Sequence, residues 1–219
     1  MNYATLLTTV ASRLNRDDLT ALIPDFVARA EEEINARLAT TPIRPMGAIS
    51  TSAIATASGG LPADFVDVID LSAADATESW QLVRLDAASP SGYYATRSLP
   101  YSVDYDSTRP RHYSIVGSTL VLSAAPASVL TLTMRYWQRL PVLATALNNW
   151  LSDRHSDVYE LGALAHAYRH LRDDAARDAH KAMFGEALEL AMASYPEMAQ
   201  PGELRSDLPI TTHWSILNG

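Results

Sequence analysis

The chain has 219 residues, 47% of them hydrophobic, and a net charge of −8. A chain of this length can bury a substantial core, and its ordinary hydrophobic content excludes global disorder. The sequence has no cysteine, which excludes disulfides, thiolate nucleophiles and cysteine metal sites. Its 17 basic residues are all arginines except Lys181, and they form no basic run. Because proteins that grip nucleic-acid phosphates carry a basic patch, tight DNA binding is disfavoured.

The N-terminus, Met1–Ala4, lacks the basic and apolar regions of a signal peptide. No run of apolar residues approaches the length that spans a membrane. We therefore expect synthesis and folding in the cytosol, with no membrane as a partner.

The first forty residues predict two amphipathic helices. Asn2 can cap the first helix, whose apolar side chains recur at helical spacing as far as Leu14. A second helix is expected from about Leu19 to Ala39. It should begin or kink at Pro24, because proline is tolerated only in the first turn of a helix. The three glutamates at 31–33 point in different directions on a helix, and we interpret them as a solvated face.

Residues 41–147 predict strands separated by turns rich in proline and glycine. Residues 65–71 suggest a strand buried on both faces or a short turn leading into one, whereas 89–96 are ambiguous and could form a short helix. The clearest signal is at 113–122, where two apolar strands flank a two-residue turn that begins with glycine. From Val129 to Trp137, apolar residues occupy alternate positions, which predicts a strand with one apolar face.

Residues 148–195 predict a long helical hairpin with Asn148 and Asn149 as candidate caps. Alanines and Gly162 line it, so its helices should pack closely. Asp173 and Asp174 separate two apolar stripes. The second stripe consists of Ala176, Ala179, Met183, Ala187, Leu190 and Ser194. On this basis, Met183 and Leu190 are expected to be core residues of the helical domain.

His166 and His170 are the most suggestive pair for a metal site, because residues four apart on a helix can share one ion. The zinc-protease pattern requires glutamate directly after the first histidine, and Ala167 stands there instead. By helical angle, both histidines lie opposite the apolar stripe. We therefore interpret them as an exposed or interface pair rather than metal ligands.

Two acid pairs could be interpreted as hydrolytic carboxylates, one at Asp153 and Asp157, the other at Asp173 and Asp174. Their positions at expected helix starts favour a structural role, because carboxylates suit helix N-termini. The sequence contains no glycine-rich phosphate loop and no nucleophile-elbow motif. The sequence therefore predicts no catalytic residue, no cofactor and no metal site, so we do not expect an enzyme.

The tail from Pro196 to Gly219 contains three prolines and shows no periodicity as a whole. Its large apolar side chains would be costly to leave in water. They are Leu204, Leu208, Ile210, Trp214, Ile216 and Leu217. We expect an extended arm that becomes ordered on assembly and uses these residues to bind a partner; the alternative is that it folds back onto its own helices.

Several short motifs occur in a fixed order along the chain. They are Leu61-Pro62-Ala63-Asp64-Phe65, Tyr113–Gly117, Tyr136–Pro141, and Asn149-Trp150-Leu151 followed by Tyr159-x-x-Gly162-Ala163-Leu164. Together with the order of the predicted elements, they resemble the head-to-tail adaptor (connector) family of tailed bacteriophages, which includes tail tubular protein A of short-tailed phages. The resemblance covers most of residues 1–195, and the tail has no counterpart pattern.

The resemblance implies a virion protein that forms a ring, commonly of twelve copies, between the portal protein and the tail or nozzle protein. It also implies an α+β fold. We expect helices 1–40 and 148–195 to form a helical bundle domain, with 41–147 inserted as an antiparallel β domain and 196–219 as the arm. DNA would pass through the central channel without specific binding, which the acidic net charge suits. We expect that channel to be acidic or neutral.

Two other classes of function remain open from the residues alone. A hydrolase with a surface carboxylate pair would require a concave pocket whose acids have perturbed pKa values. A small helical protein-binding module would act as a monomer or dimer and would not form a ring.

Overall fold

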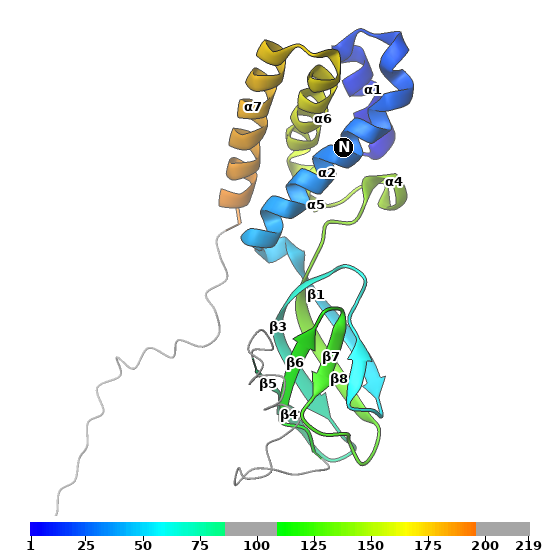
Figure 1. The fold of residues 1–219 in the computed structure, drawn as a ribbon, viewed down its shortest axis with the longest axis vertical. Helices are drawn as coiled ribbons and strands as arrows, with labels where there is room; N and C mark the ends of the chain where they lie inside the picture. Colours follow the sequence, from blue (N-terminus) through cyan, green and yellow to red (C-terminus); the bar gives the residue numbers. More distant parts are fainter. Residues whose placement is uncertain (86–108, 196–219) are drawn as a thin grey trace, which may run out of the picture.

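The computed structural model describes residues 1–85 and 109–195. The described residues mix helices with two four-stranded sheets, which confirms the α+β class. Figure 1 shows the helices gathered at one end of an elongated molecule and the strands at the other. The ambiguous segment 89–96 and the tail 196–219 lie outside the described residues. Within the described ranges, no helix combines the length and the apolar character that crossing a membrane requires.

The N-terminal helices begin where the sequence predicts. Helix α1 (Tyr3–Leu14) is capped by Asn2, whose side chain accepts a hydrogen bond from a first-turn backbone N–H at 2.8 Å. A 3₁₀ helix, η1 (Asp17–Leu22), leads directly into α2 (Ile23–Thr40). Pro24 lies in the first turn of α2, where its missing N–H has no helical partner to lose. The predicted start at this proline is confirmed.

The predicted C-terminal hairpin is present, but its first arm is not one continuous helix. The short helix α5 (Trp150–Arg154) ends at His155, and α6 (Ser156–Leu171) begins at once. Asn149 caps α5 in a reciprocal capping box with Ser152, as its position predicts. A tight turn then leads into α7 (Asp174–Ala193). Figure 1 shows α6 and α7 side by side.

Helices from both ends of the chain share one core. Among its members, α1 contributes Leu6 and Val10, and α6 contributes Val158 and Tyr159. Gly162 on α6 permits the closest approach, since a Cβ atom there would lie 2.9 Å from the Ala30 Cβ atom. This packing supports the expectation that the small residues of the hairpin bring helices close together.

The strands form two sheets with orders β1-β8-β3-β4 and β2-β7-β6-β5. Their bounds are β1 Gly47–Ile54, β2 Ser58–Gly60, β3 Phe65–Ala74, β4 Ser79–Gln81, β5 Val83–Arg84, β6 His112–Val116, β7 Thr119–Leu122 and β8 Leu130–Gln138. The hairpin β6–β7 turns at Gly117, whose φ of 61° favours glycine, so this prediction is confirmed. The apolar face predicted for the last strand is also confirmed, because Leu130, Leu132, Met134 and Tyr136 of β8 are buried.

One strand pairing departs from the expected antiparallel module, because β5 pairs with β6 in parallel. The two strands share only two residue pairs, and β5 is separated from β6 by residues 85–111. A connection of that length permits a parallel crossover, whereas a short turn would force an antiparallel pair. The remaining pairs, including the long β1–β8 and β3–β8 ladders, are antiparallel.

Segments on both sides of the strands pack with the helices. The chain passes between helices and strands twice, and a short helix lies at each passage. They are the 3₁₀ helix η2 (Arg44–Met46), between α2 and β1, and the one-turn helix α4 (Leu143–Ala146), between β8 and α5. Their Met46 and Leu143 side chains are buried in the helical core rather than among the strands. We refer below to the helices with these two segments as the helical part, and to β1–β8 as the β part.

Candidate interaction surfaces

The apolar face of α7 differs from the predicted one. Met183 and Leu190, expected in the core, are 51% and 68% exposed. The side chains that α7 buries are Phe184, Leu188 and Ala191. The prediction is wrong because α7 carries apolar residues on two faces at helical spacing, and the sequence alone does not indicate which face meets α6.

The outward side of α7 therefore presents apolar atoms to solvent. Its exposed residues at helical spacing are Ala175, Ala179, Ala182, Met183, Leu190 and Ala193. We call this set the outer face of α7. Glu186 is the one acidic residue that falls among them by helical angle. A strip of this kind, formed by small residues around two large apolar ones and interrupted by Glu186, suits packing against another helix.

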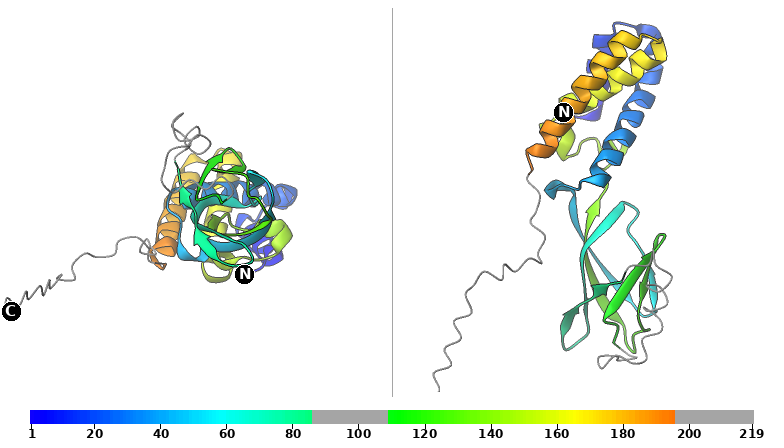
Figure 2. Two further views of the ribbon diagram at one scale, coloured as in Figure 1. Left: turned by 90° about the horizontal axis from the view of Figure 1, so that it is seen from below. Right: turned by 60° about the vertical axis from the view of Figure 1, so that its left-hand side comes forward.

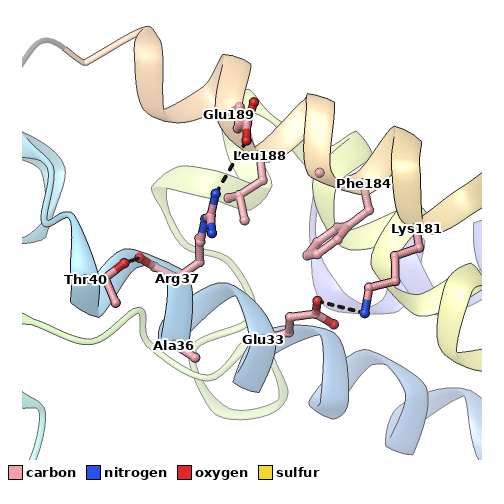
Figure 3. Close-up of a pocket in the computed structure, with 9 residues that line it drawn as sticks. Glu33, Ala36, Arg37, Thr40, Lys181, Phe184, Leu188 and Glu189 are labelled. Atoms are coloured by element: carbon pink, nitrogen blue, oxygen red, sulfur yellow. Dashed lines mark hydrogen bonds and ion pairs between the residues drawn. The ribbon is translucent and has the colours of Figure 1, made fainter.

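A groove runs along the other flank of α7, between this helix and α2 (Figure 3). Its volume is about 480 Å³, and Phe184 and Leu188 supply its apolar wall. Two ion pairs cross it, Lys181 to Glu33 and Arg37 to Glu189, each at 3.5 Å. Both pairs are exposed, so they orient the helices more than they stabilise them.

The acidic run at 31–33 is not uniformly solvated. Glu31 is only 8% exposed, and its carboxylate accepts a hydrogen bond from the backbone N–H of Leu143 at 2.8 Å. Burial raises the pKa of Glu31 above its ordinary value. Of the run, Glu32 is exposed, and Glu33 is partly buried beside Lys181. The solvated-face interpretation is therefore wrong for Glu31, because α2 turns this side chain towards the first N–H groups of α4.

Glu31 belongs to a polar junction between the two parts of the molecule. Asn35, one turn further along α2, accepts a hydrogen bond from the backbone N–H of Leu140 at 2.9 Å. The backbone carbonyl of Asp64, which precedes β3, accepts one from the backbone N–H of Arg139 at 2.8 Å. The residues that make these contacts line a cavity of about 740 Å³ beside the chain segment that connects β8 to α4. The junction therefore ties α2 to the return path of the chain by two side-chain hydrogen bonds, in addition to the apolar packing of Leu140 and Leu143 in the helical core.

Replacing Glu31 by Gln should make the pH dependence of stability weaker. Because burial raises the folded-state pKa of Glu31, its contribution to stability is fully present below the ordinary pKa of 4.5 and is lost as pH rises through the folded value. Gln keeps an acceptor oxygen for Leu143 without a charge. At pH 7 the E31Q variant should therefore be at least as stable as the parent chain, with the difference shrinking as pH is lowered towards 4.5.

The measurement is urea unfolding of both chains across this pH range. Glu32→Gln is the matched control, since it makes the same change at an exposed neighbour. A stability difference between E31Q and the parent chain that grows as pH falls would contradict this assignment.

The two histidines of α6 lie in different environments. His166 is partly buried, with its Nε2 atom 3.5 Å from a carboxylate oxygen of Glu33, and burial lowers its pKa. His170 is exposed and packs against the ring of Phe26, with 5.7 Å between the ring centroids. Within residues 1–85 and 109–195, no group of three or more His, Asp or Glu side chains could hold a metal ion.

The acid pairs occupy helix starts, as their positions predict. Asp173 caps α7 by accepting a hydrogen bond from a first-turn backbone N–H at 3.1 Å. Asp174 follows it and pairs with Arg177 one turn later. Asp153 and Asp157 lie in the first turns of α5 and α6, and Asp153 is 3.7 Å from the N-terminal ammonium group. Their described contacts are those of helix capping and surface ion pairing.

A further surface, not found from the sequence, lies at the edge of β1 that has no strand partner within residues 1–85 and 109–195, here called the free edge. The sheet order places β1 at an edge, beside a groove of about 330 Å³ that reaches β2 and β7. The sequence predicted strands within residues 41–147 but could not indicate an edge, because edge position depends on pairing with β8, some eighty residues later. The predicted partner-binding residues of the arm, from Leu204 to Leu217, lie outside the described residues.

A comparison with protein-family models finds one that covers nearly the whole chain. The model described as "SU10 adaptor protein" matches residues 1–206, which include both parts of the structure. No curated protein matches the chain. A match of this extent covers the helical part, the β part and the beginning of the tail. The chain therefore belongs to the SU10 adaptor protein family, a family of phage head-to-tail adaptors.

Proposed function

We propose that the chain assembles into a ring, of about twelve copies as the sequence resemblance implies, between the portal protein and the tail or nozzle protein of the virion. DNA passes through the centre of this ring without specific binding. Within each copy, residues 1–40 and 148–195 act as a helical domain, and 41–147 as an inserted β domain. The family supports a structural role in the phage particle, and the ring, its partners and its channel are our extension of it.

The outer face of α7 is the observation that carries this proposal. Large apolar side chains on an otherwise folded helix, such as Leu190 at 68% exposure, mark contact surfaces when they cluster. The buried face of α7 already packs within its own chain, through Phe184 and Leu188. The outer face is thus available to a neighbouring copy, and a head-to-tail contact of this kind closes into a ring when its rotation permits.

The charge balance supports passage of DNA rather than binding. Many arginines already pair with carboxylates of their own chain, which reduces the positive charge that a phosphate would meet. The pairs involve Arg13, Arg16, Arg37, Arg84, Arg109, Arg135 and Arg177. With a net charge of −8, the assembled channel would be acidic or neutral and would repel the backbone of DNA.

Placing aspartate on the outer face of α7 tests the ring contact. The double variant Met183→Asp/Leu190→Asp puts two charges into the proposed interface, where they would be buried without partners. It should stay folded and yet fail to assemble. Light scattering coupled to size exclusion measures the mass of the assembly, and circular dichroism verifies the fold.

Val129→Asp is the control, because it places one such charge on an exposed apolar residue of the β part. It should assemble as the parent chain does. Full assembly of the Met183→Asp/Leu190→Asp variant would show that the outer face of α7 lies outside the ring contact.

A further inference from the structure

The edge strand β1 lacks the features that usually protect a sheet edge. It spans eight residues, Gly47–Ile54, and carries neither a charged residue nor a proline. Among the described residues, its only strand partner is β8, with which it pairs without interruption. Edges of this length usually carry lysine, proline or a bulge, because their unpaired backbone groups recruit other strands. The free edge of β1 therefore has the properties of a docking site for a strand.

A groove for side chains lies beside this edge. Ser50 and Ser52 of β1 face it and are too small to fill it. Leu120 of β7 and Leu132 and Met134 of β8 provide apolar walls, and the volume is about 330 Å³. Strand addition uses two such elements, a backbone edge for affinity and a pocket that accepts alternate side chains for specificity.

The end of the same chain contains a segment with matching properties. Residues 210–217 read Ile-Thr-Thr-His-Trp-Ser-Ile-Leu, eight residues without proline, aspartate, glutamate, lysine or arginine. β-Branched and aromatic residues, which favour strands, dominate it. Ile210, Thr212, Trp214 and Ile216 occupy one set of alternate positions, and polar residues occupy most of the other set. This alternation is typical of a strand with one buried face.

We propose that residues 210–217 of one copy add to the free edge of β1 in a neighbouring copy, with Trp214 and Ile216 directed into the groove. This inference rests on the proposed ring and identifies the site at which the arm docks. No charged Asp, Glu, Lys or Arg side chain is desolvated on either strand, so the cost that usually opposes burial of polar surface is small.

The connecting segment is long enough for this exchange. Residues 196–209 separate the end of the described helix α7 from the proposed strand. Fourteen residues can span at most about 50 Å when fully extended. Figures 1 and 2 show α7 running towards the β part, so the connecting segment starts on the side of the helical part that faces β1.

The stoichiometry is compatible with a neighbouring copy as the source of the strand. Each chain has one donor segment and one acceptor edge, so a closed ring of copies would pair every donor and cover every edge. Each exchange would also add backbone hydrogen bonds to the contact through α7.

Disulfide trapping tests the exchange directly, because the chain has no cysteine of its own. Thr51 is exposed on β1 and does not line the groove. A Thr51→Cys chain is mixed with chains carrying Thr211→Cys, His213→Cys or Ser215→Cys, which sample the possible registers. After oxidation of the full-length protein, at least one mixture should give disulfide-linked dimers.

Thr212→Cys is the matched control, since it lies on the opposite face of the proposed strand and should not be trapped with Thr51→Cys. A second pair of variants tests the same alternation without cysteine. Ile216→Asp should abolish docking, whereas Leu217→Asp, its outward-facing neighbour, should retain it. Equal trapping at alternate positions would overturn the proposed strand, since it would indicate an arm docked without strand geometry.

The mass of the assembly, measured on the same samples, separates this inference from the proposed ring. Rings that form without any trapped pair would overturn the strand exchange and leave the ring intact. A chain that carries both Thr51→Cys and a tail cysteine serves as a further sample. If the disulfide formed only within such chains and never between mixed single-cysteine chains, exchange between copies would be overturned. Failure of the parent chain to assemble, alone or with the portal protein, would contradict the ring itself.

Discussion

Replacing Phe184 by Ala should lower the free energy of unfolding by about 3–5 kcal/mol, because it empties a site where a buried aromatic ring packs against α6. Met183→Ala, at the adjacent position, should change it by less than about 0.5 kcal/mol in the monomer, because Met183 faces solvent. Urea unfolding at a protein concentration low enough to prevent assembly gives both values.

This pair of neighbouring residues decides which face of α7 is the core face. If Met183→Ala cost more than Phe184→Ala, α7 would be rotated from its described orientation, and the outer face would not exist as a free surface.

Replacing Gly162 by Ala should destabilise the helical part by about 1–3 kcal/mol, as expected for overpacking of a filled core. The added Cβ atom would lie 2.9 Å from the Ala30 Cβ atom and 3.1 Å from a ring carbon of Phe184. Since these atoms belong to three helices packed together, α2, α6 or α7 would have to move.

Gly185→Ala is the matched control on α7, because a Cβ atom there meets nothing within 4 Å. In a helix interior, alanine is more stable than glycine by roughly 0.5–1 kcal/mol, so this variant should be neutral or stabilised. In thermal unfolding, the midpoint of Gly162→Ala should therefore fall, whereas the midpoint of Gly185→Ala should rise or stay unchanged. Equal shifts would mean that the α2–α6 contact is looser than described.

Local signals in the sequence were sufficient for many elements. The Asn2 cap, the helix start at Pro24, the glycine turn at Gly117 and the alternation along β8 all depend on residues close together in the chain. In each case the physical cause, a cap, a fixed φ angle or a period of two, acts within one turn or one strand.

The features that the sequence missed depend on distant partners. Which face of α7 is buried depends on α6 and α2, and Glu31 is buried because α4 returns to it from more than one hundred residues away. The edge position of β1 likewise follows from the late strand β8. Neither a helical period nor a β-leaning composition contains this information, since both faces of α7 satisfy the same period.

The function could be predicted from motifs that resemble a known family, and not from catalytic or ligand-binding residues. Motifs such as Leu61–Phe65 and Tyr136–Pro141 indicated the adaptor family, which the family model confirms over residues 1–206. The expected binding residues of the arm remain a prediction, since they lie outside the described part of the chain. The structure adds two surfaces that the resemblance did not suggest, the outer face of α7 and the edge of β1.

The mass of the species that the purified full-length chain forms, alone and with the portal protein of the same virus, tests most directly whether the chain assembles into a ring. Light scattering on the eluting species gives this mass without reference to shape. We expect a discrete, closed assembly of many copies, formed either alone or on the portal. A chain that stays monomeric or dimeric in both samples would contradict the proposed ring.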